Sequence, residues 1–103
     1  MVFSLAGQVL EGPFFYPSDL KNERGVYVVV GQRDGGGWYP LDVDESAVVR
    51  TSVNQHSRHK CWQEQSQAGL GYAVLYLPGS SSEERRARAA TIRECCGPLP
   101  CDL

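Results

Sequence analysis

The sequence predicts an α+β fold: a small three-stranded, mainly antiparallel sheet flanked by helices in the order β-β-α-β-α. A small mixed three-layer α/β arrangement is the alternative. Two apolar runs, residues 25–31 and 69–77, have the β-branched and aromatic content of buried strands. A glycine-rich turn follows the first run, so the strand after it must pair antiparallel with it. Two polar segments that begin with helix-capping residues complete the pattern.

Residues 1–24 are predicted to form an irregular lead-in, because glycines and prolines interrupt every apolar pattern there. The first strand covers residues 25–31. Residues 33–37, Arg-Asp-Gly-Gly-Gly, supply the positive φ angles that a tight turn requires. The chain returns over residues 38–43, where Pro40 indicates an edge strand or a bulge.

A helix is predicted from residue 44 to about His59. Its first residues, Asp-Glu-Ser, carry the acidic and hydroxyl side chains that stabilise the start of a helix. Val49, Val53 and His56 follow at i, i+4 and i+7, which is the spacing of a buried helix face. This helix therefore links the hairpin to the third strand.

The third strand, residues 69–77, is apolar throughout and is expected to be central in the sheet. A last helix is predicted to begin within residues 80–84, which contain two overlapping Ser-x-x-Glu capping boxes. We expect it to end at Gly97-Pro98, because Gly97 supplies a left-handed cap residue and proline cannot continue the helix.

The length and charge of the chain limit its organisation. A chain of 103 residues can fill one hydrophobic core but not two, so residues 1–103 are predicted to be a single domain with its core in residues 25–102. Ten Lys and Arg residues against twelve Asp and Glu residues give a net charge of −2. This balance excludes a general electrostatic attraction to nucleic acid.

The sequence favours a cytoplasmic protein. Its apolar runs are far shorter than the roughly 20 residues that cross a bilayer. The N-terminal residues lack the basic start and long apolar run of a signal peptide, so no membrane partner is expected. Disulfides are rare in a reducing compartment, and thiols are therefore expected at all four cysteines. These are Cys61, Cys95, Cys96 and Cys101.

The order of the motifs points to a known family. Gly25-Val26-Tyr27 opens the first strand, residues 42–46 end the hairpin, and the next helix carries His56. The strand around residues 72–76, an arginine-rich helix and the ending at residues 98–102 follow. This succession resembles the GIY-YIG nuclease superfamily over residues 25–102. The resemblance implies a nuclease-like fold in which Tyr27 matches the tyrosine that helps to activate the attacking water.

The resemblance also implies that the residues of catalysis have been lost. Ser46 matches the serine of the second family motif, and counting from it puts Ser52 at the catalytic arginine position and His56 at the histidine position. The metal-binding glutamate position falls on Arg88 or Ala89. Phosphodiester cleavage requires a cation beside the phosphate. We therefore expect a degenerate, non-catalytic member that holds no cofactor.

An active endonuclease with a rewired site is the alternative. It would use Tyr27, Arg50 and His56, with Glu45 or Glu84 as a ligand of a Mg²⁺ ion. This hypothesis predicts that these side chains converge in one cleft.

A zinc site is the second alternative chemistry. His56, His59 and Cys61 form a His-x-x-His-x-Cys string that offers nitrogen and sulfur ligands, and the C-terminal cysteines offer more. The spacing matches no paired Cys-x-x-Cys motif, so the sequence assigns no metal ligand. Metal binding by His56, His59 and the cysteines stays open as an alternative.

Three hypotheses for the function remain. The first is a non-catalytic interaction module for a nucleic acid or a protein, with Arg85 and Arg88 of the last helix as candidate nucleic-acid contacts. The opposing interpretation of these arginines is a solvated face balanced by glutamates. The second hypothesis is the endonuclease above. The third is a homodimeric structural protein that associates through the Pro40 edge strand or through an aromatic patch of Phe14, Phe15, Trp38 and Trp62.

Overall fold

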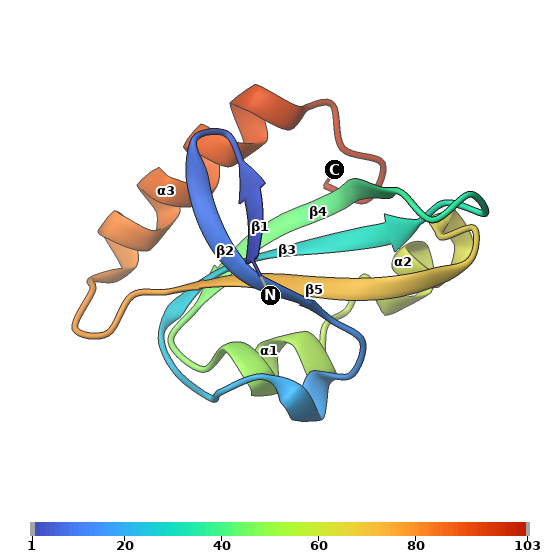
Figure 1. Ribbon diagram of the computed structural model, residues 1–103. Coiled ribbons are helices and arrows are strands. Elements are labelled where there is room, and N and C mark those ends of the chain that lie inside the picture. The colour runs from blue at the N-terminus through green and yellow to red at the C-terminus, as the bar shows by residue number, and fades with distance from the viewer. Residues whose placement is uncertain (1, 103) are drawn as a thin grey trace.

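The computed structural model describes residues 2–102 as one antiparallel sheet with helices on both faces (Figure 1). The strand order across the sheet is β1-β2-β5-β3-β4. The α+β class is therefore confirmed, but the sheet has five strands where the sequence predicted three. In chain order the elements are β1 (Val2–Leu5), β2 (Gln8–Phe14), the short 3-10 helix η1 (Pro17–Asp19), β3 (Gly25–Gln32), β4 (Trp38–Ser46), α1 (Val49–Asn54), α2 (His59–Gln65), β5 (Gly69–Tyr76) and α3 (Ser82–Cys96).

The three strands predicted from the sequence form one end of the sheet. β3 pairs antiparallel with β4 on one side and with β5 on the other. Residues 25–31 of β3 are all buried, which explains their continuous apolar run. β4 continues past residue 43, because Glu45 and Ser46 pair with Val26 and Gly25 of β3. Residues 44–46 therefore belong to a strand, and the prediction that they begin a helix is wrong.

The predicted irregular lead-in instead contains a hairpin. β1 pairs with β2, and β2 extends the sheet by pairing with β5. Ala6 and Gly7, which both have positive φ angles, form the turn between β1 and β2. Leu10 of β2 is fully buried and joins the core. The sequence did not indicate these strands because the spacing of Val2, Leu5 and Val9 is also that of a helix.

The single helix predicted between residue 44 and His59 is divided in two. Val49 and Val53 are buried on α1, as predicted. α1 ends at Asn54, and His56 lies in the connection before α2 rather than on a helix.

α3 follows its prediction closely. It begins after Ser81, whose side chain forms a capping box with Glu84, and it ends before Gly97. Gly97 has an extended backbone (φ −74°), so the prediction of a left-handed cap is wrong.

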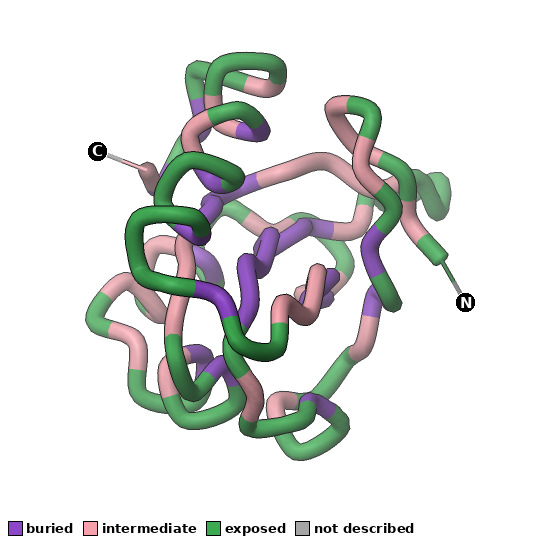
Figure 2. Tube along the Cα trace, turned by 90° about the vertical axis from the view of Figure 1, so that its left-hand side faces the viewer, coloured by how far each residue is buried: buried purple, intermediate pink, exposed green. Residues whose placement is uncertain are grey.

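Each face of the sheet has its own hydrophobic core, because successive side chains of a strand point to opposite faces. Tyr27 and Val29 of β3 pack with residues of α1 and α2. Val26 and Val28 pack with Ala89 of α3 and with residues of the β1–β2 hairpin. In Figure 1, α1 and α3 lie on opposite sides of the sheet, and Figure 2 shows buried segments concentrated towards the middle of the molecule. Side chains of α3 at Ala89 are therefore separated from Tyr27 by the sheet.

The segment after α3 closes the outer edge of β4. Cys101 is bonded to Cys61 of α2, so the prediction of free thiols is wrong for this pair and holds for Cys95 and Cys96. The Cys101 N–H donates to the Leu41 carbonyl (2.9 Å), which satisfies an edge group of β4. In the part of the chain that the structure describes, no helix is long and apolar enough to span a bilayer.

Candidate functional site

The polar side chains that meet between β4 and α2 are centred on Asp42. β4 places Asp42 and Asp44 on one face of the sheet, the face that carries Tyr27, because Asp42 pairs with Val29 and Asp44 with Tyr27. Asp42 is only 1% exposed. Its carboxylate accepts hydrogen bonds from Arg58 Nε (2.7 Å) and Nη2 (3.1 Å). It is a buried charge held by a guanidinium in a bidentate arrangement.

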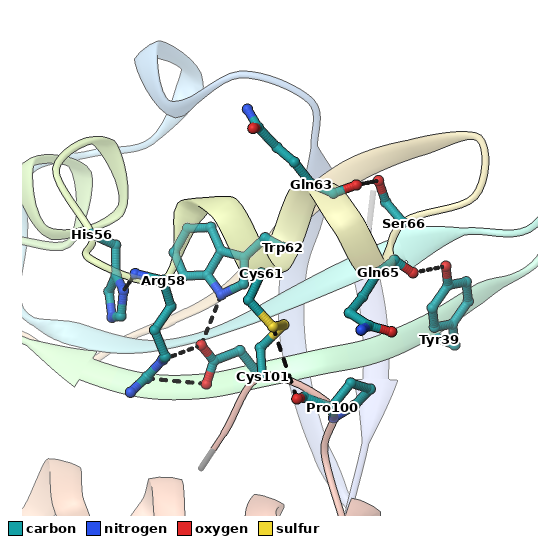
Figure 3. The surroundings of a disulfide bond; sticks show 11 residues. Tyr39, His56, Arg58, Cys61, Trp62, Gln63, Gln65, Ser66, Pro100 and Cys101 are labelled. Atoms are coloured by element: carbon teal, nitrogen blue, oxygen red, sulfur yellow. Dashed lines mark hydrogen bonds and ion pairs between the residues drawn. A yellow bond between two sulfur atoms is a disulfide. The ribbon is translucent and has the colours of Figure 1, made fainter.

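Trp62 completes the surroundings of this carboxylate. The Trp62 Nε1–H donates to Asp42 Oδ2 at 2.8 Å, and the indole ring is fully buried. Figure 3 shows Arg58 and Trp62 converging there, beside the Cys61–Cys101 disulfide. Arg58 and Trp62 thus supply three hydrogen bonds to the Asp42 carboxylate, all from within the fold itself.

Asp44 and His56 extend the cluster toward solvent. Asp44 Oδ2 lies 3.1 Å from His56 Nε2 and accepts from Arg58 Nη2 at 3.3 Å. The Arg58 backbone N–H donates to His56 Nδ1 (3.1 Å), so Nδ1 is an acceptor and the ring proton lies on Nε2. Burial opposes the charge of Arg58, but its hydrogen bond to Asp42 and the charges of both carboxylates outweigh that effect and raise its pKa.

Tyr27, the predicted catalytic tyrosine, is fully buried (0% exposed). Its hydroxyl shares a hydrogen bond of 2.9 Å with Ser52 Oγ, and its ring meets that of His56 edge-on at 6.4 Å between centroids. Burial raises the pKa of Tyr27 above its ordinary value, an effect that outweighs the hydrogen bond to Ser52. The structure thus brings together Tyr27, His56 and Ser52, the residue at the family's arginine position.

Arg50 lies elsewhere. It is exposed on α1 and lines an open cavity beside η1, whose lining includes neither Tyr27 nor His56. The two proposed Mg²⁺ ligands have other partners: Glu45 pairs with Arg85 at 2.8 Å, and Glu84 takes part in the α3 capping box. Within residues 2–102 there is no group of three or more His, Cys, Asp or Glu side chains that could hold a metal ion.

The candidate nucleic-acid contacts on α3 differ in availability. Arg85 is buried, and besides Glu45 its guanidinium donates to the Ser80 carbonyl at 2.8 Å. Arg88 is exposed and reaches the Gln8 side chain at 3.3 Å. Arg85 therefore fastens α3 to β4, and Arg88 is the one of the pair that faces solvent.

The surfaces suggested for a homodimer are partly covered. Two carbonyls at the edge of β4 beside Pro40 already accept hydrogen bonds. The Cys101 N–H donates to the Leu41 carbonyl, and Arg93 donates to the Val43 carbonyl at 2.8 Å. Trp62 is buried in the core, so it cannot belong to an exposed aromatic patch. Phe15 is exposed and packs against the half-buried Trp38.

Sequence reasoning missed Arg58 and the role of Asp42, and it placed Trp62 in an exposed aromatic patch instead of beside Asp42. The Asp-Val-Asp pattern of residues 42–44 was an available signal, since alternate residues of a strand share a face. Nothing in the sequence indicated their partner, because Arg58 lies in a loop 16 positions from Asp42. Comparisons of the chain with models of protein families, with curated proteins and with solved structures give no match.

Proposed function

We propose that this chain is a non-catalytic GIY-YIG-like domain that acts as an interaction module. The observation that carries the proposal is the burial of Tyr27. Tyr27 is fully buried, and its hydroxyl forms a hydrogen bond with Ser52 Oγ. A group that activates a water molecule must lie within hydrogen-bond reach of that water, or reach it through one other water. A phenol enclosed in the core, with a raised pKa, does not meet this requirement.

The charge of the neighbouring cluster supports the same conclusion. The positive charge of Arg58 is opposed by two carboxylates, Asp42 and Asp44. His56 lies beside them, with Nε2 3.1 Å from Asp44 Oδ2 and with Nδ1 accepting from the Arg58 backbone N–H. The cluster is therefore net negative, and it repels a phosphodiester instead of stabilising the charge that develops during cleavage.

Arg50, the arginine assigned to the rewired nuclease, lies at the surface. Arg50 stands on the exposed side of α1, in a cavity that Tyr27 and His56 do not line. A cation separated from the tyrosine and the histidine that the rewired nuclease would use can bind an anionic partner but lacks the groups assigned to cleave it. These positions support binding without turnover as the role of the domain.

Incubation with nucleic acid tests this proposal. Purified protein is mixed with single- and double-stranded DNA and RNA in the presence of Mg²⁺ or Mn²⁺. We expect no cleavage above a control that contains a chelator. The protein and its Tyr27→Phe variant should behave identically. Metal-dependent cleavage that disappears in the Tyr27→Phe variant, while circular dichroism shows that the variant is folded, would overturn the proposal in favour of the endonuclease.

A further inference from the structure

The cavity between η1 and α1 has a lining rich in hydrogen-bond donors. Its volume is about 200 Å³. That is smaller than the roughly 300–1,000 Å³ of pockets that enclose a drug-sized molecule, so it suits a single small group of a ligand. Five of its six lining residues carry side chains that can donate hydrogen bonds, and none is acidic. The lining consists of Pro17, Ser18, Arg50, Thr51, Asn54 and Gln55.

The walls of this cavity are held in place by hydrogen bonds of the fold. The Thr51 N–H donates to Asn22 Oδ1 (3.0 Å), and the Val49 N–H donates to the Glu23 carbonyl (3.1 Å). These bonds fix the first turn of α1 against the segment that follows η1. A preformed site avoids the cost of ordering its groups when a ligand binds.

Arg50 gives the cavity its charge. Arg58, Arg85 and Arg93 are each paired with a carboxylate, whereas Arg50 forms no ion pair within residues 2–102. Asp19 belongs to η1 but is not part of the lining. A guanidinium with no carboxylate partner, surrounded by hydroxyl and amide donors, matches the oxygens of a phosphate group.

We propose that this cavity binds one phosphate group of a polynucleotide or of a free nucleotide, with Arg50 as its cation. The inference rests on the proposed function, because it names the partner of the interaction module as a phosphate-bearing ligand. The side-chain amides of Asn54 and Gln55 and the hydroxyls of Ser18 and Thr51 supply further donors. Several donors around one cation favour a group with oxygens on several sides over a planar carboxylate.

Titrations followed by ¹H–¹⁵N NMR test the site. The ligands are a 12-nucleotide single-stranded DNA, a nucleoside monophosphate and inorganic phosphate. We expect the largest shifts at Arg50, Asn54 and Gln55. Arg50→Gln should weaken binding at least tenfold. The matched control is Arg33→Gln, which removes the same charge from the exposed turn between β3 and β4, outside the cavity lining, and should change the affinity less than twofold.

The ligand series distinguishes the two sources of phosphate. Tighter binding of the oligonucleotide, with a log-log salt slope that falls by about one in Arg50→Gln, identifies a polynucleotide backbone. Equal binding of the mononucleotide identifies a free nucleotide. Both results support the site.

Other results would overturn the inference. Binding that Arg50→Gln leaves unchanged, or that Arg33→Gln weakens as much, would exclude the cavity but leave the non-catalytic module intact. The absence of binding by all three ligands would do the same and would favour a protein partner. Metal-dependent cleavage, by contrast, would overturn the proposed function even if the cavity binds phosphate.

Discussion

Asp42 joins β4 to a later segment of the chain, because Arg58 and Trp62 lie 16 and 20 positions after it. Its carboxylate on β4 binds Arg58 from the loop after α1 and Trp62 from α2. Moving a carboxylate out of water costs several kcal/mol, and only good partners offset this cost. Here the partners are a bidentate guanidinium and an indole N–H, so the charge is stable only while all three residues are in place.

The substitution Asp42→Asn tests this dependence. It leaves Arg58 without its buried anion, and we expect it to lower the free energy of unfolding by about 3 kcal/mol. Asp44→Asn is the matched control, because Asp44 is more exposed and should lose less than about 1 kcal/mol. Urea denaturation followed by tryptophan fluorescence measures both. Equal losses would show that burial of Asp42 does not govern the strength of the pair.

At the scale of elements, local patterns predicted the structure where they were long and consistent. β3, β5 and α3 were recognised because each has an apolar run or a cap that one kind of element explains. β1 and β2 were missed, since strands of four and seven residues fit a helical spacing equally well. The break between α1 and α2 was also missed, and contacts to β4 accompany it: His56 and Arg58 bind Asp44.

The candidate site was predictable only in part. Counting along the chain singled out Tyr27, Ser52 and His56, and the structure brings these side chains together. The sequence positions could not reveal that Tyr27 is enclosed, because burial depends on how α1 packs against the sheet. Ion pairs such as Arg58 with Asp42 depend on the tertiary path of the chain in the same way.

The capping box of α3 provides a test at this scale. Of the two overlapping boxes in the sequence, the structure forms the one between Ser81 and Glu84. Ser81→Ala removes the acceptor for the Glu84 N–H (3.1 Å) and should cost about 1 kcal/mol of stability. Ser82→Ala, one residue along, removes only a long contact with Arg86 and should be nearly neutral. A thermal unfolding series compares them. A larger loss for Ser82→Ala would show that the helix begins at a different residue.

For the whole molecule, the Cys61–Cys101 bond has the widest effect, because it closes a loop that includes α2, β5 and α3. Its cysteines are 40 positions apart. Restricting the unfolded chain by a loop of this length is worth about 4 kcal/mol in the chain-entropy model. Reducing the bond should therefore shift the unfolding midpoint of the entire protein.

Cys101→Ser is expected to lower stability by about this amount under oxidising conditions. The control Cys95→Ser alters an exposed free thiol and should have little effect. Adding a reductant should bring the unmodified protein down to the stability of Cys101→Ser and leave that variant unchanged. A midpoint that does not respond to reductant would mean that the bond contributes nothing to the stability of the fold.

The two edges of the sheet differ in whether their outer backbone groups are already hydrogen-bonded. The outer edge of β4 is occupied by the backbone of Cys101 and by the side chain of Arg93. At the other edge, β1 has β2 as its single neighbour among the described strands. A strand from another chain would therefore meet occupied backbone groups beside β4 and none of these bonds beside β1. The fold has a partly covered end and an open end, and lengthening of the sheet is favoured at the open one.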